Sequence, residues 1–107
     1  MSELVRTLSQ GLHPVELALR PEKSLRALKE CLERRYVHVK FTDTRGGTEL
    51  GVRIDESTAQ LALGGVDGTE RTVHISGNLS LDYVPVRCIV DVNLDTYEGA
   101  GHLERLQ

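Results

Sequence analysis

The sequence predicts a two-layer α+β domain, in which one main amphipathic helix and a short N-terminal helix pack on a largely antiparallel sheet of about five or six strands. Apolar residues recur at helical spacing between about residues 21 and 35 and near the N-terminus. From residue 36 onward they alternate with polar residues, and turn sequences separate the alternating segments. Together these patterns favour helices packed against one face of a sheet.

Length and composition fit a single domain spanning residues 1–107. The chain is 39% hydrophobic and 27% charged, as is usual for globular proteins. Three tyrosines, one phenylalanine and no tryptophan leave leucine, valine and isoleucine to build the core. The composition therefore argues against a fibrous or disordered chain.

The N-terminal third is expected to hold a short helix, a strand and the main helix. Apolar residues have helical spacing over residues 4–8 and alternate as in a strand over residues 15–19. Pro21 suits the first turn of a helix over about residues 21–35, whose charged side carries Glu-Arg pairs four residues apart. The apolar side of this helix consists of Leu25, Leu28, Cys31 and Leu32.

Two hairpins are expected to follow. Apolar residues alternate over residues 37–41 and again over residues 50–54, on either side of the turn sequence Arg45-Gly46-Gly47. A second hairpin is predicted around Asp67-Gly68, because glycine readily takes a positive φ in a tight turn. The alternating apolar residues of this second hairpin are Ala59, Leu61, Leu63, Val73 and Ile75.

The C-terminal part contains the longest alternation, from Val84 to Leu94, which predicts a strand with one buried and one wet face. Before it, Gly77-Asn78 is a further candidate turn. After it, residues 95–98 have the spacing of a capped helix start, although the glycines that follow would end such a helix early.

Net charge and hydropathy exclude several partners. A formal net charge of −3 argues against nucleic acid, because phosphate binding needs surplus lysine and arginine. No apolar run approaches the roughly 18 residues of a membrane helix, and Met1-Ser2-Glu3 opens no signal peptide. We therefore expect no nucleic acid, no membrane and a cytoplasmic location. The first 40 residues carry 8 basic and 5 acidic side chains, whereas the remainder carries 5 and 11.

The sequence contains no motif that indicates catalysis, a metal or a cofactor. Histidines and cysteines lack close ligand spacing, and neither a nucleophile elbow nor a phosphate-binding loop is present. Cys31 and Cys88 fall among apolar neighbours, which is typical of inert core thiols. We expect no cofactor and no metal, and we name no catalytic residue.

The polar face of the predicted sheet is the remaining candidate site. His38 and His74 lie on the polar sides of their strands and would meet if those strands were neighbours, with Asp82 or Asp91 nearby. Ile89 interrupts this polar row, a sign that part of the face is covered. The candidate binding residues on this face are Tyr36, His38, Arg53, His74, Arg87 and Asp91.

These features favour a non-enzymatic binding or interaction module. It would bind a protein partner, or a second copy of itself, through the polar sheet face or an edge strand. The alternative hypothesis is a small enzyme or ligand-binding protein with a pocket between helix and sheet or at a subunit interface. In that case His38 and His74 would be the acid–base groups.

Overall fold

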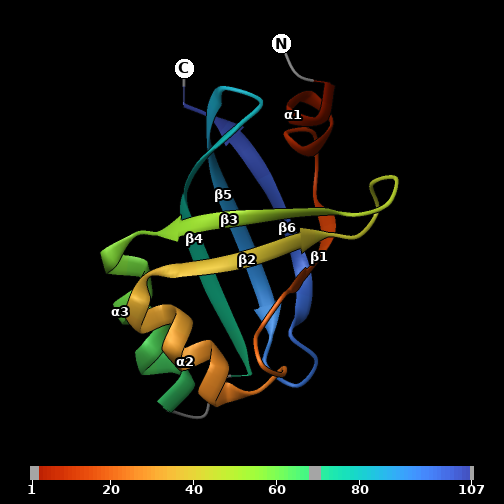
Figure 1. The fold of residues 1–107 in the computed structure, drawn as a ribbon. Helices are drawn as coiled ribbons and strands as arrows, with labels where there is room; N and C mark the ends of the chain where they lie inside the picture. Colours follow the sequence, from red (N-terminus) through yellow and green to blue (C-terminus); the bar gives the residue numbers. More distant parts are fainter. Residues whose placement is uncertain (1–2, 68–70, 107) are drawn as a thin grey trace.

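The computed structural model describes residues 3–67 and 71–106, and in them six antiparallel strands form a closed barrel (Figure 1). The strands follow chain order around the barrel, and the last one pairs with the first. This confirms the α+β class and the antiparallel sheet, but the sheet closes on itself instead of forming one open layer. The elements are α1 (Glu3–Leu8), β1 (His13–Leu17), α2 (Leu25–Arg34), β2 (Tyr36–Phe41), β3 (Thr48–Ile54), α3 (Glu56–Asp67), β4 (Thr72–Leu81), β5 (Val84–Asn93) and β6 (Glu98–Arg105).

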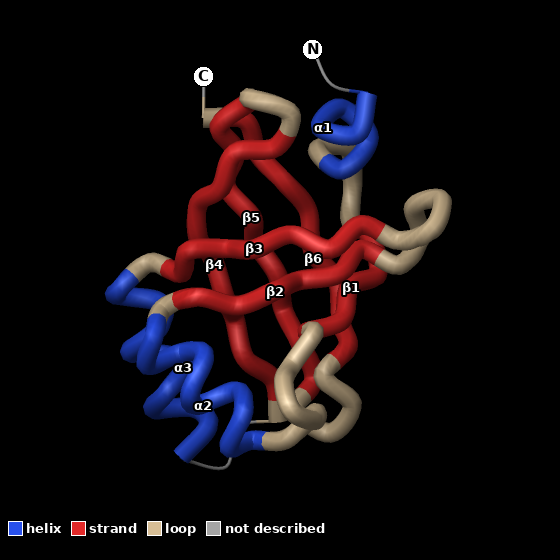
Figure 2. Tube along the Cα trace, viewed as in Figure 1, coloured by secondary structure: helices blue, strands red, loops and turns tan. Residues whose placement is uncertain are grey.

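The barrel interior is the hydrophobic core, and it is built from leucine, valine and isoleucine as the composition predicts. In Figure 2, β2 and β3 cross in front of β4, β5 and β6, and alternate residues of β2 and β5 are buried. Burial of these side chains supplies most of the stabilising free energy, since apolar surface is removed from water. The largest fully buried side chains include Phe41, Leu17, Leu28, Ile75 and Leu103.

The predicted first hairpin is confirmed as β2 and β3. Their ladder runs from Tyr36 opposite Arg53 to Phe41 opposite Thr48, and every second side chain of β2 is buried. Gly46 and Gly47 in the connecting loop both have a φ of 76°, a conformation that glycine adopts without steric cost.

The main helix is present as α2, but it begins at Leu25 and not near Pro21. Ser24 caps it, because the Ser24 hydroxyl accepts a hydrogen bond from the Ala27 amide at 3.2 Å. The helix ends at Arg34, and Arg35 takes a left-handed conformation with a φ of 58°. This turn leads directly into β2, so the end of α2 lies beside the start of the sheet.

The segment predicted as the first strand of the second hairpin is instead helix α3. Its buried residues are Ala59, Ala62 and Val66, which have helical spacing, whereas Leu61 is 77% exposed. The apparent alternation therefore came from a leucine that faces water. Helix α3 ends at Asp67, and the remainder of the predicted turn at Asp67-Gly68 lies outside the described residues. Helices α2 and α3 pack on each other at one end of the barrel (Figure 1).

The true reversal after β4 lies at Asp82 and Tyr83, not at Gly77-Asn78. Both reversal residues have positive φ values, 51° and 66°. Gly77 is inside β4, where a Cβ atom would collide with the carbonyl oxygen of Arg53 on β3. It therefore permits close strand approach and makes no turn.

The predicted long strand is confirmed as β5, which pairs with β4 over ten residue pairs. The residues after it form a turn followed by strand β6, so no helix begins at Asp95. Gly99 fits β6 because a Cβ atom there would collide with the Asp91 carbonyl oxygen on β5.

Candidate binding surface

The shortest ladder of the barrel joins β3 to β4, and we call this join the seam. The two strands pair only where Arg53 lies opposite Asn78 and Ile54 lies opposite Gly77. Beyond these pairs, residues 48–52 of β3 and 79–81 of β4 diverge. Strands β3 and β4 cross near the C-terminal end of β3. The β4–β5 hairpin extends beyond this crossing point (Figure 1).

The seam leaves backbone hydrogen-bonding groups of β3 without a strand partner. The Ile54 amide donates to the Arg35 carbonyl at 2.9 Å, so even-numbered residues of β3 bond towards β2. The backbone amide and carbonyl groups of the odd-numbered residues consequently point towards β4. Glu49 and Gly51 therefore present an amide and a carbonyl to the seam, and among residues 3–67 and 71–106 no strand pairs with them there.

A groove of about 500 Å³ follows the seam. Leu79 is half-buried against the core and supplies apolar surface, while Leu106 is exposed at the groove. The groove thus combines apolar surface, polar side chains and the unpaired edge of β3. Its lining residues are Tyr36, Gly51, Arg53, Asn78, Leu79, Ser80, Pro85 and Leu106.

Tyr36 lies over the outer face of β3 because Gly51 has no side chain. A Cβ atom at Gly51 would collide with the Tyr36 hydroxyl. The Tyr36 ring also makes an edge contact with His38, with ring centroids 5.3 Å apart, and it lies opposite Arg53 in the ladder. Three predicted binding residues, Tyr36, His38 and Arg53, are therefore together on one surface.

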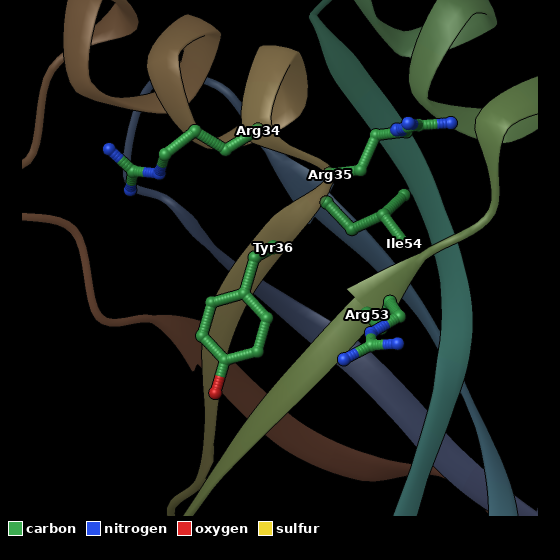
Figure 3. A pocket seen from close by; sticks show the side chains of 5 residues that line it. All are labelled: Arg34, Arg35, Tyr36, Arg53 and Ile54. Atoms are coloured by element: carbon green, nitrogen blue, oxygen red, sulfur yellow. The ribbon is translucent and has the colours of Figure 1, made fainter.

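A second depression of about 480 Å³ adjoins the groove, between the end of α2 and the sheet (Figure 3). Arg34, Arg35, Tyr36, Arg53 and Ile54 line it. Arg53 lies beside the Tyr36 ring, while Arg34 and Arg35 extend to opposite sides. The alternative hypothesis placed a pocket in this type of location, between helix and sheet, and Arg34 belongs to the charged side of the predicted helix.

The arginines of this depression have little compensating negative charge. Arg35 forms an exposed ion pair of 3.6 Å with Glu56. Arg34 donates to the Cys31 sulfur at 3.6 Å, and Arg53 has no ion pair or side-chain hydrogen bond within the described part of the chain. The surface is therefore suited to an anionic ligand.

His74 and Asp91 form a separate pair on the opposite half of the barrel. They lie opposite each other on β4 and β5, and His74 Nδ1 is 2.9 Å from an Asp91 carboxylate oxygen. His38 is on β2, which β3 separates from β4, and no hydrogen bond or ring contact between described residues joins the two histidines. The two histidines were predicted to meet only if their strands were neighbours, and in the barrel those strands are not neighbours.

Arg87, a further predicted binding residue, is partly exposed and belongs to a hydrogen-bond network. Its guanidinium donates to the Asp55 carboxylate, to the Ser76 hydroxyl at 3.0 Å and to the Asn78 amide oxygen at 3.3 Å. Ser76 is only 3% exposed. The network ties β5 and β4 to the residue that precedes α3.

Metal binding and thiol chemistry find no support in the described part of the chain. It holds no group of three or more histidine, cysteine, aspartate or glutamate side chains that could bind a metal ion. Both cysteines are buried, and burial raises the pKa of Cys88 to about 12 and the pKa of Cys31 above its usual value. Both cysteines are therefore core residues, and burial disfavours the thiolate form on which thiol reactivity depends.

His13 is a structurally important residue that sequence analysis did not find. Its Nε2–H donates to the carbonyl oxygens of Thr7 and Gln10, each at 2.9 Å, and Nδ1 lies 2.8 Å from the Asp43 carboxylate. The hydrogen bond to Asp43 raises the pKa of His13, although burial opposes it. His13 thus connects the end of α1 to the loop after β2, a contact across 30 residues that no local pattern reveals.

Neither the family models nor the curated proteins contain a match to this chain. Within the described residues no helix has the length and hydrophobicity to cross a membrane. The fold and the surface define a small closed β-barrel with a helical end, an open seam and an arginine-rich depression beside it.

Proposed function

We propose that the chain is a non-enzymatic interaction module that binds an extended, acidic segment of a partner protein by adding it as a strand to β3 at the seam. The observation that carries this proposal is the two-pair ladder between β3 and β4. It leaves the backbone groups of Glu49 and Gly51 unpaired beside the groove. A strand edge of this kind binds extended peptides through main-chain hydrogen bonds.

The lining of the groove supports an extended segment with apolar side chains on one side. Side chains alternate across a strand, so a segment paired with β3 would place every second residue towards the core. On that side it would cover Leu79, which is only half-buried. Burial of apolar surface would add free energy to the hydrogen bonds.

The outward side chains of the segment should be acidic. Arg53 follows the unpaired part of β3, and the depression beyond it adds Arg34 and Arg35. Opposite charges across an interface speed association and select the partner. Catalysis receives no comparable support, because the His74 and Asp91 pair is exposed and both thiols are buried.

The proposal is tested with peptides of about seven residues whose charged ends are blocked. This length is enough to span the unpaired part of β3. The probe alternates valine with glutamate, and its control replaces each glutamate with lysine. In a titration followed by amide NMR, the acidic peptide should shift the Glu49 and Gly51 signals, whereas the lysine peptide should not. Equal binding of both peptides would contradict an acidic partner.

N-methylation separates strand addition from simple charge attraction. Methyl groups on one set of alternate peptide amides should abolish binding, because those amides face β3, whereas methylation of the other set should preserve it. Equal effects of both sets would refute pairing with β3. Arg53→Ala should weaken the acidic peptide about tenfold, in the range of a charge-assisted hydrogen bond. Arg26→Ala is the matched control, since Arg26 is an exposed helix arginine 90% accessible to water.

Self-association is the competing use of the same edge. Sedimentation of the protein alone, over a range of concentrations, measures it. A dimer that excludes the acidic peptide and dissociates in the Arg53→Ala variant would assign the β3 edge to a second copy and overturn the proposed partner.

A further inference from the structure

We infer that the partner segment carries a phosphorylated side chain, which the depression between α2 and the sheet binds. The inference rests on the proposed function and specifies the chemistry of its ligand. Tyr36 and Arg53 line both the groove and the depression, so the two form one continuous surface. A segment that lies along β3 therefore leads to the depression.

The ladder at the seam determines where the segment leaves the strand edge. Arg53 and Ile54 already pair with β4, so an added strand cannot continue past Gly51 along β3. Its next residues must pass over the outer face, where Tyr36 and Arg53 lie. From there the neighbouring lining residues are Arg34 and Arg35, at the end of α2 (Figure 3).

The charge of the depression matches a dianion better than a single carboxylate. Arg34, Arg35 and Arg53 line it, and Glu56 forms an ion pair with Arg35. These four side chains carry a net charge of +2. A phosphorylated serine, threonine or tyrosine carries about −1.5 to −2 at neutral pH and offers three acceptor oxygens. A carboxylate would neutralise half of the positive charge.

Binding requires the arginines to turn towards the phosphate. Arg34 and Arg35 extend to opposite sides of the depression, and the ion pair of Arg35 with Glu56 is more than half exposed on both sides. Exposed side chains change rotamer within nanoseconds, and exposed ion pairs are weak. Arg35 can therefore exchange Glu56 for a phosphate, with which guanidinium forms paired hydrogen bonds.

The experiment uses the peptide of alternating valine and glutamate, extended by one serine or one phosphoserine. Separate peptides carry the added residue at the N-terminal or at the C-terminal end, just beyond the part that pairs as a strand. One phosphoserine peptide should bind about ten times more tightly than its serine counterpart, as expected for added charge-assisted hydrogen bonds. This gain should shrink at pH 5, because the phosphate loses its second charge near pH 6. Arg35→Ala should remove most of the gain, and Arg26→Ala should preserve it.

The outcomes separate this inference from the proposed function. Equal affinities for serine and phosphoserine peptides, with the N-methylation pattern intact, would refute the phosphate site and leave strand addition supported. If the acidic peptides do not bind at all, both ideas fail. If inorganic phosphate or an oligothymidylate binds as tightly as the phosphopeptide, the site serves a free anion or a nucleic acid, and the inference is overturned.

Discussion

Replacing Arg87 with methionine should destabilise the barrel strongly, because one guanidinium donates to three side chains, two on β4 and one just before α3. Arg87 donates to the Asp55 carboxylate, the Ser76 hydroxyl and the Asn78 amide oxygen. Methionine preserves the apolar stem but removes every donor. It would leave the Ser76 hydroxyl without a partner among the described residues, in a position that is 3% exposed.

The expected loss is about 2 to 3 kcal/mol of unfolding free energy. A hydrogen bond to a charged group contributes about 1.5 to 3 kcal/mol, and an unsatisfied buried hydroxyl costs about 1 kcal/mol or more. The Arg87 and Asp55 side chains are 31% and 28% exposed, so screening places the ion pair at the lower end of that range. For a domain of this size the midpoint of thermal unfolding should fall by about 10 °C or more.

Urea denaturation of wild type, Arg87→Met, Asp55→Ala and the double variant measures both the loss and its origin. The two single changes should not add, and their coupling should reach about 1 kcal/mol, because the side chains contact each other. A loss below about 0.5 kcal/mol for Arg87→Met, or strict additivity, would refute the structural role of this network.

Three further substitutions and one chemical modification probe other parts of the fold. Since the pKa of His13 is raised in the folded state, its stabilising effect should be full below about pH 6.5 and decline as pH rises through the folded pKa. Urea denaturation should therefore show a larger difference between wild type and His13→Gln at low pH, and a constant difference would contradict this. A thiol reagent should modify native Cys88 only as fast as the barrel opens, and more slowly than Cys31. Gly64→Ala should stabilise α3 by about 0.5 to 1 kcal/mol, because the added methyl group enters open space. Gly77→Ala should cost about 1 to 3 kcal/mol, because its methyl group meets the Arg53 carbonyl, and calorimetry distinguishes the two signs.

Local patterns predicted the parts of the fold that depend on neighbouring residues. The hairpin of β2 and β3 follows from two alternations and a glycine turn, and it also brings Tyr36 and Arg53 together. Helix α3 was missed because its buried face consists of small residues, whereas Leu61 imitated a strand. Packing of these small residues against α2 and β4, which no local pattern shows, determines that the segment is a helix.

The surface was only partly predictable for a similar reason. The seam depends on how far β3 and β4 pair, and helix α3 separates these strands in the chain. Its consequences for Glu49 and Gly51 are therefore invisible in sequence. Arg34 and Arg35 have the pattern of ordinary exposed helix charges, and the sharp turn at Arg35 is what places them in the lining of the same depression as Arg53.

The β3–β4 ladder has the fewest residue pairs of the barrel, so the resistance of this joint to opening depends on the bonds just beyond it, from the Asp55 amide to the Ser76 carbonyl and within the Arg87 network. Opening there leaves the ladders of β1 to β3 and of β4 to β6 intact, joined through the β1 and β6 pairing and the α3 connection. Local openings of low free energy occur where few contacts must break. A bound segment would hold this joint shut, so ligand affinity and resistance to unfolding should rise together.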